Sequence, residues 1–219
     1  MKNLFRAAAI AVASTALVAG GTVTGAQAAT GDFANIAVQD AALYGYKGAT
    51  TKLIPVALNS NLTYVYATVN VNGVPVANNV YVGSSGFTYQ QAWGAGVVTL
   101  SNLRDSSTAS GQPVVGGSNA FSVRYGVEGT SGIKVRKKGK KLTFRVKARY
   151  IDNRGVAVGI RRATIQVHKK GKWRTLKNLK LKSNGTRTYK RSDKSKRKYR
   201  LVVKTTSVYQ GGSTRGLRI

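Results

Sequence analysis

Cysteine is absent from this chain of 219 residues, which contains one histidine and only six acidic residues. The lack of cysteine excludes disulfides, thiol nucleophiles and lipid attachment through an N-terminal cysteine. With a single histidine as well, the chain cannot form a metal site of the His/Cys type. Burial of apolar side chains must therefore hold the fold together, and the length is sufficient for one or two cores.

Long apolar runs are also missing after the N-terminus. Lys2 and Arg6 precede an apolar stretch over residues 7–19, and Ala26-Gln27-Ala28 has the small-x-small form of a signal-peptidase site. The stretch is shorter than the about 20 residues that cross a bilayer as a helix. We expect residues 1–28 to be a cleaved signal peptide, so that the mature protein is secreted, begins at Ala29 and has no transmembrane segment.

Groups that could perform catalysis are equally scarce. His168 is predicted to point outward from a strand beside a lysine pair, as a solvated surface residue does. Neither Asp152 nor Asp193 is near a G-x-S-x-G motif, and the few carboxylates do not sort into a glycosidase pair. No phosphate-binding G-x-x-x-x-G-K-[ST] motif occurs. We expect no enzymatic activity, no cofactor and no metal.

Positive charge, in contrast, is abundant and unevenly distributed. The net charge of the whole chain is +30. Residues 29–130 contain four basic and four acidic residues, whereas residues 131–219 contain 30 basic residues against Asp152 and Asp193, a net charge of +28. Such asymmetry predicts two domains with separate roles, a neutral one over 29–130 and a strongly basic one over 131–219.

Apolar residues in the neutral half alternate with polar ones, which is typical of half-buried strands. The alternating sets are Ile36/Val38, Ile54/Val56/Leu58, Val65/Ala67/Val69/Val71 and Phe121/Val123/Tyr125/Val127. Asn72-Gly73 lies between two such runs and predicts a tight hairpin turn, because both turn positions need a positive φ. Gly-, Ser- and Asn-rich clusters at 83–86, 92–96 and 105–119 separate the rest. These features favour an antiparallel β-sandwich.

The basic half shows the same alternation with Lys and Arg at the outward positions. Residues 142–150 read as one strand, and Ile165/Val167 and Tyr199/Leu201/Val203 mark two more. The sequence Lys-Lys-Gly-Lys occurs at 137–140 and again at 169–172, each time between strands. Glycine supplies the backbone freedom that a short hairpin needs, so both copies are predicted hairpin tips.

The last 80 or so residues contain three segments of a recognisable pattern. They are Ala163-Thr-Ile-Gln-Val-His-Lys-Lys-Gly-Lys-Trp-Arg-Thr-Leu-Lys177, Ser183-Asn184-Gly185 and Tyr199-Arg-Leu-Val-Val203. Over about 139–219 the chain resembles the immunoglobulin-like repeats of secreted actinobacterial proteins, and the neutral half resembles no named family. The resemblance implies a β-sandwich but no activity, since such repeats accompany enzymes, adhesins and wall proteins alike. We therefore predict an all-β protein of two tandem antiparallel, immunoglobulin-like β-sandwich domains.

A basic strand is suited to a repeating anionic partner. Outward side chains recur about 6.6–6.8 Å apart along a strand, so Arg145, Lys147 and Arg149 could follow a chain of phosphates or carboxylates. A net charge of +28 on one domain also exceeds the magnitude of about 2–8 that solubility requires. The candidate polyanion-binding residues are Lys137, Lys138, Lys140, Lys141, Arg145, Lys147, Arg149, Lys169, Lys170, Lys172, Arg174, Lys194, Lys196, Arg197, Lys198 and Arg200.

The expected partner is an anionic polymer at the cell surface. Phe144, Tyr150 and Tyr199 share parity with core residues, so sequence-specific nucleic-acid recognition through exposed aromatics is not supported, and the orientation of Trp173 is undecided. Wall teichoic acid, acidic polysaccharide, nucleic acid bound without sequence specificity and an anionic membrane surface all fit the charge. Electrostatic adhesion would keep the protein at the cell wall.

Two alternatives remain open. In one, the neutral half of an adhesin-like protein binds a carbohydrate or protein through aromatic residues, and the basic half is only a wall tether. The aromatic candidates are Tyr64, Tyr66, Tyr81, Tyr89 and Trp93, of which Tyr81 is expected to fill the core. In the other, the charge is a solvated surface without a ligand. A cationic antimicrobial or toxin role shares the charge argument of the polyanion-binding prediction, and the sequence does not separate the two.

Overall fold

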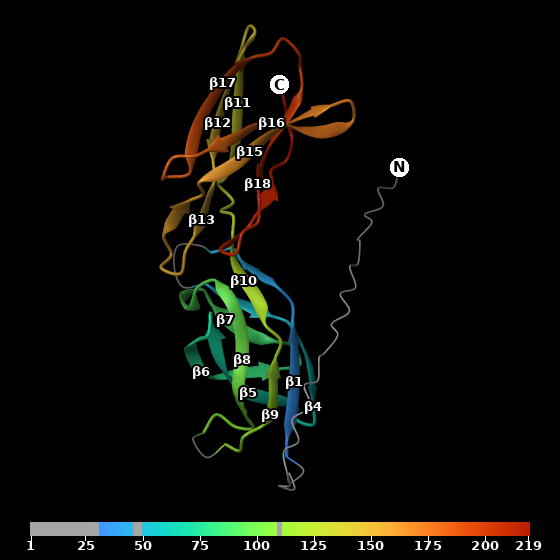
Figure 1. The fold of residues 1–219 in the computed structure, drawn as a ribbon, viewed down its shortest axis with the longest axis vertical. Coiled ribbons are helices and arrows are strands. Elements are labelled where there is room, and N and C mark those ends of the chain that lie inside the picture. Colours follow the sequence, from blue (N-terminus) through green and yellow to red (C-terminus); the bar gives the residue numbers. More distant parts are fainter. Residues whose placement is uncertain (1–30, 46–49, 109–110) are drawn as a thin grey trace, which may run out of the picture. The chain divides into compact units, whose positions relative to one another are not determined.

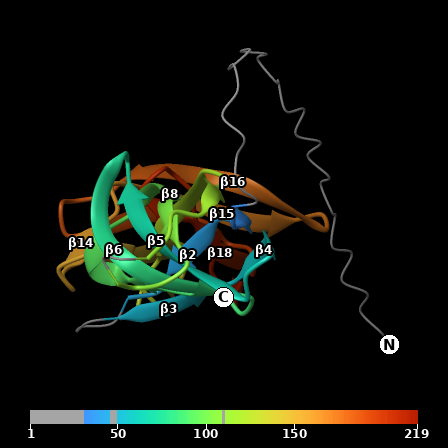
Figure 2. The same cartoon turned by 90° about the horizontal axis from the view of Figure 1, so that it is seen from below.

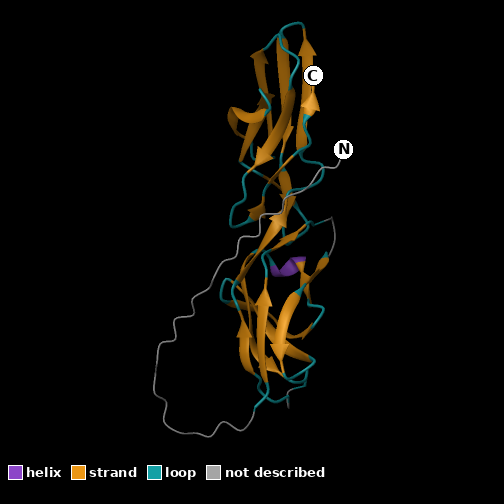
Figure 3. Cartoon of the chain, turned by 90° about the vertical axis from the view of Figure 1, so that its right-hand side faces the viewer, coloured by secondary structure: helices purple, strands orange, loops and turns teal. Residues whose placement is uncertain are grey.

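A computed structural model describes residues 31–45, 50–108 and 111–219. Within them the chain forms twenty-one β-strands and one three-residue 3-10 helix, η1 (Gln91–Trp93), shown in purple in Figure 3. The predicted all-β class is confirmed. The predicted signal peptide over 1–28 lies outside the described residues. No helix in the described part is long and apolar enough to cross a membrane.

The first core lies between two sheets and a hairpin (Figure 1). One sheet has the order β4 (Val56–Ser60), β1 (Phe33–Val38), β9 (Val115–Ser118). The other has the order β19 (Tyr209–Gln210), β10 (Phe121–Gly126), β8 (Gly96–Arg104), β5 (Tyr64–Val71), β6 (Val74–Gly83), with β2 (Ala41–Leu43) also paired to β10. The hairpin consists of β3 (Thr51–Ile54) and β7 (Phe87–Gln90). Figure 2 shows β5, β6 and β8 side by side, as their pairing requires.

The structure of this half agrees with some of the local sequence predictions and differs from others. Asn72 and Gly73 both have positive φ (53° and 80°) and form the predicted turn between β5 and β6. Pro55, however, splits the predicted strand over Ile54–Leu58 into β3 and β4, which pair with different strands. The reason is that proline has no backbone N–H to donate to the hydrogen-bond ladder of a sheet, and it restricts the backbone conformation of the preceding residue.

Strand β9 was not predicted, because its Val-Gly-Gly-Ser sequence lies in a stretch that reads as a turn. It pairs in parallel with β1, from Phe33 opposite Val115 to Ile36 opposite Ser118. Gly116 has a φ of 129°, and a Cβ at this position would collide with the carbonyl oxygen of Ala34. Glycine is thus what lets the two backbones approach.

The second core also lies between two sheets. One has the order β11 (Gly132–Lys138), β12 (Lys141–Lys147), β17 (Thr186–Ser192). The other has the order β16 (Lys172–Lys180), β15 (Arg162–Lys169), β18 (Lys198–Val203), β20 (Gly212–Ser213), with β21 (Leu217–Arg218) also paired to β18. Phe144, Ile165 and Tyr199 are fully buried between them, which agrees with the inward parity expected for Phe144 and Tyr199.

The predicted strand over 142–150 is interrupted. β12 ends at Lys147, and the chain continues as β13 (Arg149–Ile151), which pairs with β14 (Ala157–Gly159). The change of sheet takes place at Ala148, whose N–H donates to the Gly185 carbonyl at 2.9 Å and whose carbonyl accepts the N–H of Ile160 at 3.0 Å.

Residues 31–219 form one compact unit that contains both cores. Tyr150 and Tyr209 pack against both clusters, and the Tyr150 ring stacks on Tyr125 with centroids 5.3 Å apart. The side-chain amide of Gln91 donates to the carbonyl of Asp152. The division into domains at residue 130 stays a prediction.

Candidate functional site

The outer face of the β11-β12-β17 sheet carries a grid of basic side chains. Leu142, Phe144 and Val146 of β12 point into the core, so the residues between them point outward. Strand register places the outward residues in four rows: Lys138–Lys141–Ser192, Arg136–Thr143–Lys190, Lys134–Arg145–Thr188 and Gly132–Lys147–Thr186. No acidic residue occurs in these three strands. We refer to these four rows as the basic sheet face.

The basic sheet face includes cations that sequence reasoning missed. Lys134 and Arg136 alternate with Ile133 and Val135, so the period-two pattern could have identified them. Lys190 could not be found in this way, because its place beside Thr143 depends on the long-range pairing of β17 with β12.

The ladder expected from Arg145 through Arg149 does not continue along one strand. Arg145 is exposed on the basic sheet face, and Lys147 lies in its last row with Nζ donating to Thr130 Oγ1 at 2.8 Å. Arg149 belongs to β13, where its Nε donates to the Asn184 carbonyl at 2.8 Å. The change of sheet at Ala148 therefore removes Arg149 from the row.

The first Lys-Lys-Gly-Lys copy is a hairpin tip, as predicted. Lys138 is paired with Lys141, so Gly139 and Lys140 form a two-residue loop. Lys137 points back from the tip, and its Nζ donates to the Lys194 carbonyl at 2.9 Å. One predicted cluster thus contacts another.

The second copy is also a tip, but its register differs by one residue. Lys169 is paired with Lys172, so the loop consists of Lys170 and Gly171. Both have positive φ, 49° and 73°, as a type I′ turn requires. Glycine is the second loop residue here and the first in the other tip, so the two identical tetrapeptides present their lysines differently.

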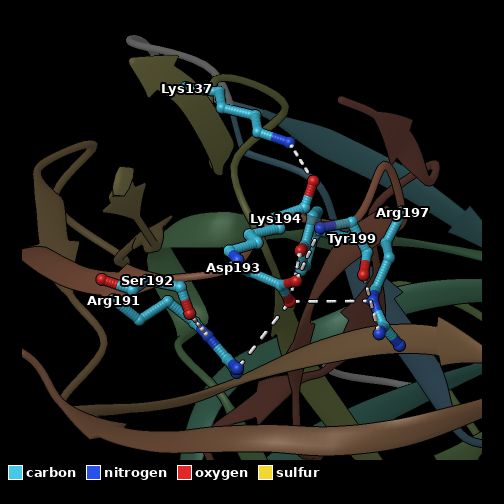
Figure 4. A network of polar contacts seen from close by, with 8 residues as sticks. Lys137, Arg191, Ser192, Asp193, Lys194, Arg197 and Tyr199 are labelled. Carbon is cyan, nitrogen blue, oxygen red and sulfur yellow. Dashed lines mark hydrogen bonds and ion pairs between the residues drawn. The ribbon is translucent and has the colours of Figure 1, made fainter. Parts of the chain in front are cut away.

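The segment after β17 is organised by Asp193, whose side chain is only 10% exposed (Figure 4). Its carboxylate lies 3.7 Å from Arg191 Nη2 and 3.6 Å from Arg197 Nε, and it accepts the backbone N–H of Ser195 at 3.0 Å. Burial raises the pKa of Asp193, but the Ser195 hydrogen bond and the charges of Arg197 and Arg191 outweigh it, so the pKa lies below the usual carboxyl value. The single carboxylate thereby holds a loop of cations in place.

This loop and the second tip together form a concave basic site of about 500 Å³, which we call the basic pocket. It is lined by His168, Lys169, Lys170, Arg174, Ser195, Lys196 and Arg197. Five of the predicted polyanion-binding residues therefore converge from two segments that are about 20 residues apart in sequence. The convergence depends on how the loop packs against the tip, which no sequence pattern encodes.

The outer face of the β16-β15-β18 sheet carries Trp173. Trp173 is paired with His168, which has outward parity, and the two rings are 5.1 Å apart. The guanidinium of Arg200 lies 4.4 Å from the Trp173 ring centroid, and its Nε donates to Gln166 Oε1 at 2.8 Å. One aromatic side chain therefore does lie on a basic surface, with Arg200 held over it by a cation–π contact.

The remaining predicted cations are spread over other parts of the same half. Lys172 is exposed beside the second tip. Lys194 is exposed in the loop after β17, and Lys198 is exposed on β18 opposite Arg218. None of these three lies on the basic sheet face or lines the basic pocket.

The aromatic candidates of the neutral half divide into two groups. Tyr89 is fully buried and donates to the Gly94 carbonyl, so it cannot contact a partner. Tyr81 is 49% exposed, which corrects the expectation that it fills the core. It contacts Tyr64 and Tyr66 with ring centroids 5.3 and 5.9 Å apart. Whether this half binds a carbohydrate or protein stays a prediction.

Among residues 31–45, 50–108 and 111–219, no group of three His, Asp or Glu side chains could hold a metal ion. His168, the one histidine, lines a pocket whose other lining residues are five cations and a serine.

Comparisons with known proteins do not assign the chain to a family. No family model matches the sequence, and no curated protein is similar to it. The D0–D1 domain of intimin aligns at 15% identity and a TM-score of 0.26, covering 84% of this chain and 96% of that chain. The D00–D0 domain of intimin aligns at 10% identity and a TM-score of 0.27, covering 85% and 98%. Extracellular domains 3–5 of Drosophila OTK align at 12% identity and a TM-score of 0.22, covering 80% and 60%. The fold is defined by its strands and their pairing.

Proposed function

We propose that the protein is a secreted, non-enzymatic protein of the cell surface whose basic half binds extended polyanions. The observation that supports this most directly is the basic sheet face, on which exposed cations occupy successive rows of one sheet. Hydroxyl groups of Thr143, Thr188 and Ser192 lie between them and can donate neutral hydrogen bonds to the same ligand.

The spacing of the grid suits a polymer better than a single ion. Rows along a strand are about 6.6–6.8 Å apart and neighbouring strands about 4.7–4.9 Å apart, so an anionic chain can meet several cations at once. Each contact releases counterions, which makes binding steeply dependent on salt and indifferent to sequence. Wall teichoic acid, acidic polysaccharide and nucleic acid all provide such a chain, and anchoring at the cell wall would follow from binding the first of these.

The test is binding of long-chain polyphosphate and of purified wall teichoic acid across a series of salt concentrations. The double substitution Lys134→Gln with Arg145→Gln removes two exposed cations from one row. We expect weaker binding, and a slope of log affinity against log salt that is less steep by about 1.5, because each lost phosphate contact changes it by about 0.7–0.9.

The matched control is Arg162→Gln with Lys180→Gln, a cross-strand pair of exposed cations outside the basic sheet face. It removes the same charge and should leave most of the slope intact. Affinity unchanged between 50 mM and 500 mM salt, or equal effects of the two double substitutions, would contradict the proposal.

A further inference from the structure

The basic pocket has a different shape from the basic sheet face and shares no residue with it. It is concave, and its walls come from two segments, the β15–β16 tip and the loop at 195–197. Its described lining residues include five Lys or Arg side chains and no carboxylate. Like charges that converge in this way repel one another in the empty protein, and an anion that enters relieves the repulsion.

The tip side of the pocket is positioned by strand register. Arg174 is paired with Val167, a buried core residue, and Lys169 is the next residue of the same parity on β15. Arg174 and Lys169 therefore extend from the face of the hairpin that covers the core. They lie at its tip, beyond the last buried core residue of β15, Val167. Lys170 follows in a tight type I′ turn, which limits how far its backbone can move.

The loop side is positioned by Asp193 and by the C-terminal strand segment. The Ser195 N–H is held by Asp193, and Arg197 Nη2 donates to Ser195 Oγ at 3.2 Å. The backbone N–H groups of Arg197 and Ile219 each donate to the other's carbonyl at 3.0 Å. Both walls are thus formed before a ligand arrives, which lowers the entropic cost of binding.

The chemistry of the lining selects the class of ligand. Arginine forms bidentate hydrogen bonds to tetrahedral oxyanions and lysine acts as a mobile point charge, so the combination suits a dianion with several acceptor oxygens. A phosphate monoester carries about −1.5 to −2 charge at pH 7 and three acceptor oxygens. A volume of about 500 Å³ holds such a group with several hydrating waters, each of which takes about 30 Å³.

We propose that the basic pocket binds a single phosphate group, either inorganic phosphate or the terminal phosphate monoester of a larger molecule. This site is separate from the extended polyanion surface, and either can exist without the other. A terminal phosphate in the pocket would add a chain-end contact to a protein that otherwise binds along a chain.

The experiment is isothermal titration of the full-length secreted chain at constant ionic strength. The ligands are inorganic phosphate, glycerol phosphate and acetate. We expect saturable binding of one phosphate per chain, at least about tenfold tighter than acetate. Stronger binding of glycerol phosphate than of inorganic phosphate would assign the site to a terminal monoester, and the reverse would assign it to the free ion. Phosphate binding no tighter than acetate binding overturns the proposal.

Substitutions locate the site. Lys170→Asn keeps a residue that tolerates positive φ, and Arg174→Gln keeps a long polar side chain, so both variants should fold. Each should weaken phosphate binding about tenfold, the loss expected for one charge-assisted hydrogen bond. Lys196→Gln tests the loop side independently of the hairpin, with a thermal melt as the check on folding.

The control is the double substitution Lys134→Gln with Arg145→Gln on the basic sheet face. It should weaken polyphosphate binding and leave the affinity for inorganic phosphate unchanged. If the pocket variants and the basic-sheet-face variant weakened phosphate binding equally, phosphate would be attracted by the overall charge. That result would overturn the proposed phosphate site. Loss of polyphosphate binding alone bears only on the extended surface.

Discussion

At the scale of single residues, Asp193 organises the loop that follows β17 in the basic half. It is one of two carboxylates among 30 basic residues in 131–219, yet it contacts Arg191, Arg197 and the Ser195 backbone. The Tyr199 hydroxyl also lies 3.5 Å from its Oδ2 (Figure 4). The negative charge of Asp193 therefore has a local role: it fixes the loop of cations that follows β17.

Asp193→Asn should therefore destabilise the protein by about 1–2 kcal/mol, since charge-assisted contacts are lost. The folded-state pKa of Asp193 is lowered, so its stabilisation is present above the usual carboxyl pKa of about 3.9 and disappears as pH falls through the lower folded value. The measurement is the melting temperature from pH 2 to pH 6.

In this series the parent protein should lose more stability on acidification than the Asp193→Asn variant does. Asp32→Asn, a carboxylate change in the neutral half, is the control. Identical pH profiles for the parent and Asp193→Asn would show that the carboxylate does not hold the loop.

At the scale of elements, the change of sheet after β12 depends on a close approach of three backbone segments. Gly185 has a φ of 76°, and a Cβ there would collide with the carbonyl oxygen of Ala148 and lie 3.1 Å from the Cα of Gly159. The same Ala148 ends β12 and directs Arg149 into β13. The Asn184-Gly185 turn, 37 residues further along, thus limits the length of the cationic row.

A pair of glycine substitutions separates backbone strain from collision. Gly171 has nearly the same φ, 73°, but nothing lies within 4 Å of its would-be Cβ. Gly171→Ala should cost about 1–2 kcal/mol from the left-handed backbone alone. Gly185→Ala should cost about 1–3 kcal/mol more, because the neighbouring backbone must shift. Urea unfolding gives both values, and equal costs would refute the close approach.

At the scale of the whole molecule, charge segregation sets conditions on stability. The 28 net positive charges of residues 131–219 lie on a β scaffold with its own core, where self-repulsion opposes compaction. Salt screens such repulsion over a Debye length of about 10 Å at 0.1 M.

The melting temperature of the full-length chain should accordingly rise between 50 mM and 500 mM sodium chloride. Long-chain polyphosphate at low salt should raise it further, by the equivalent of about 2.7 kcal/mol at a concentration of 100 times the dissociation constant. If neither salt nor polyphosphate changed the melting temperature, repulsion between the positive charges would not limit the stability of the fold.

The sequence by itself determined the class of structure and much of its local detail. Period-two alternation is a direct consequence of strand geometry, so β5, β10, β15 and β18 were predictable, as was the Asn72-Gly73 turn. The charge asymmetry was visible in the same way, because it is a property of composition.

Only the tertiary structure decided what those local signals could not contain. The parallel pairing of the glycine-rich β9, the departure of Arg149 from the cationic row and the outward position of Trp173 depend on neighbours distant in sequence. The basic pocket is of the same kind, since a hairpin tip and a loop become one site only when the core brings them together. The periodicity of a strand in the sequence predicts which face of the sheet a residue occupies, whereas tertiary packing determines which residues contact that face.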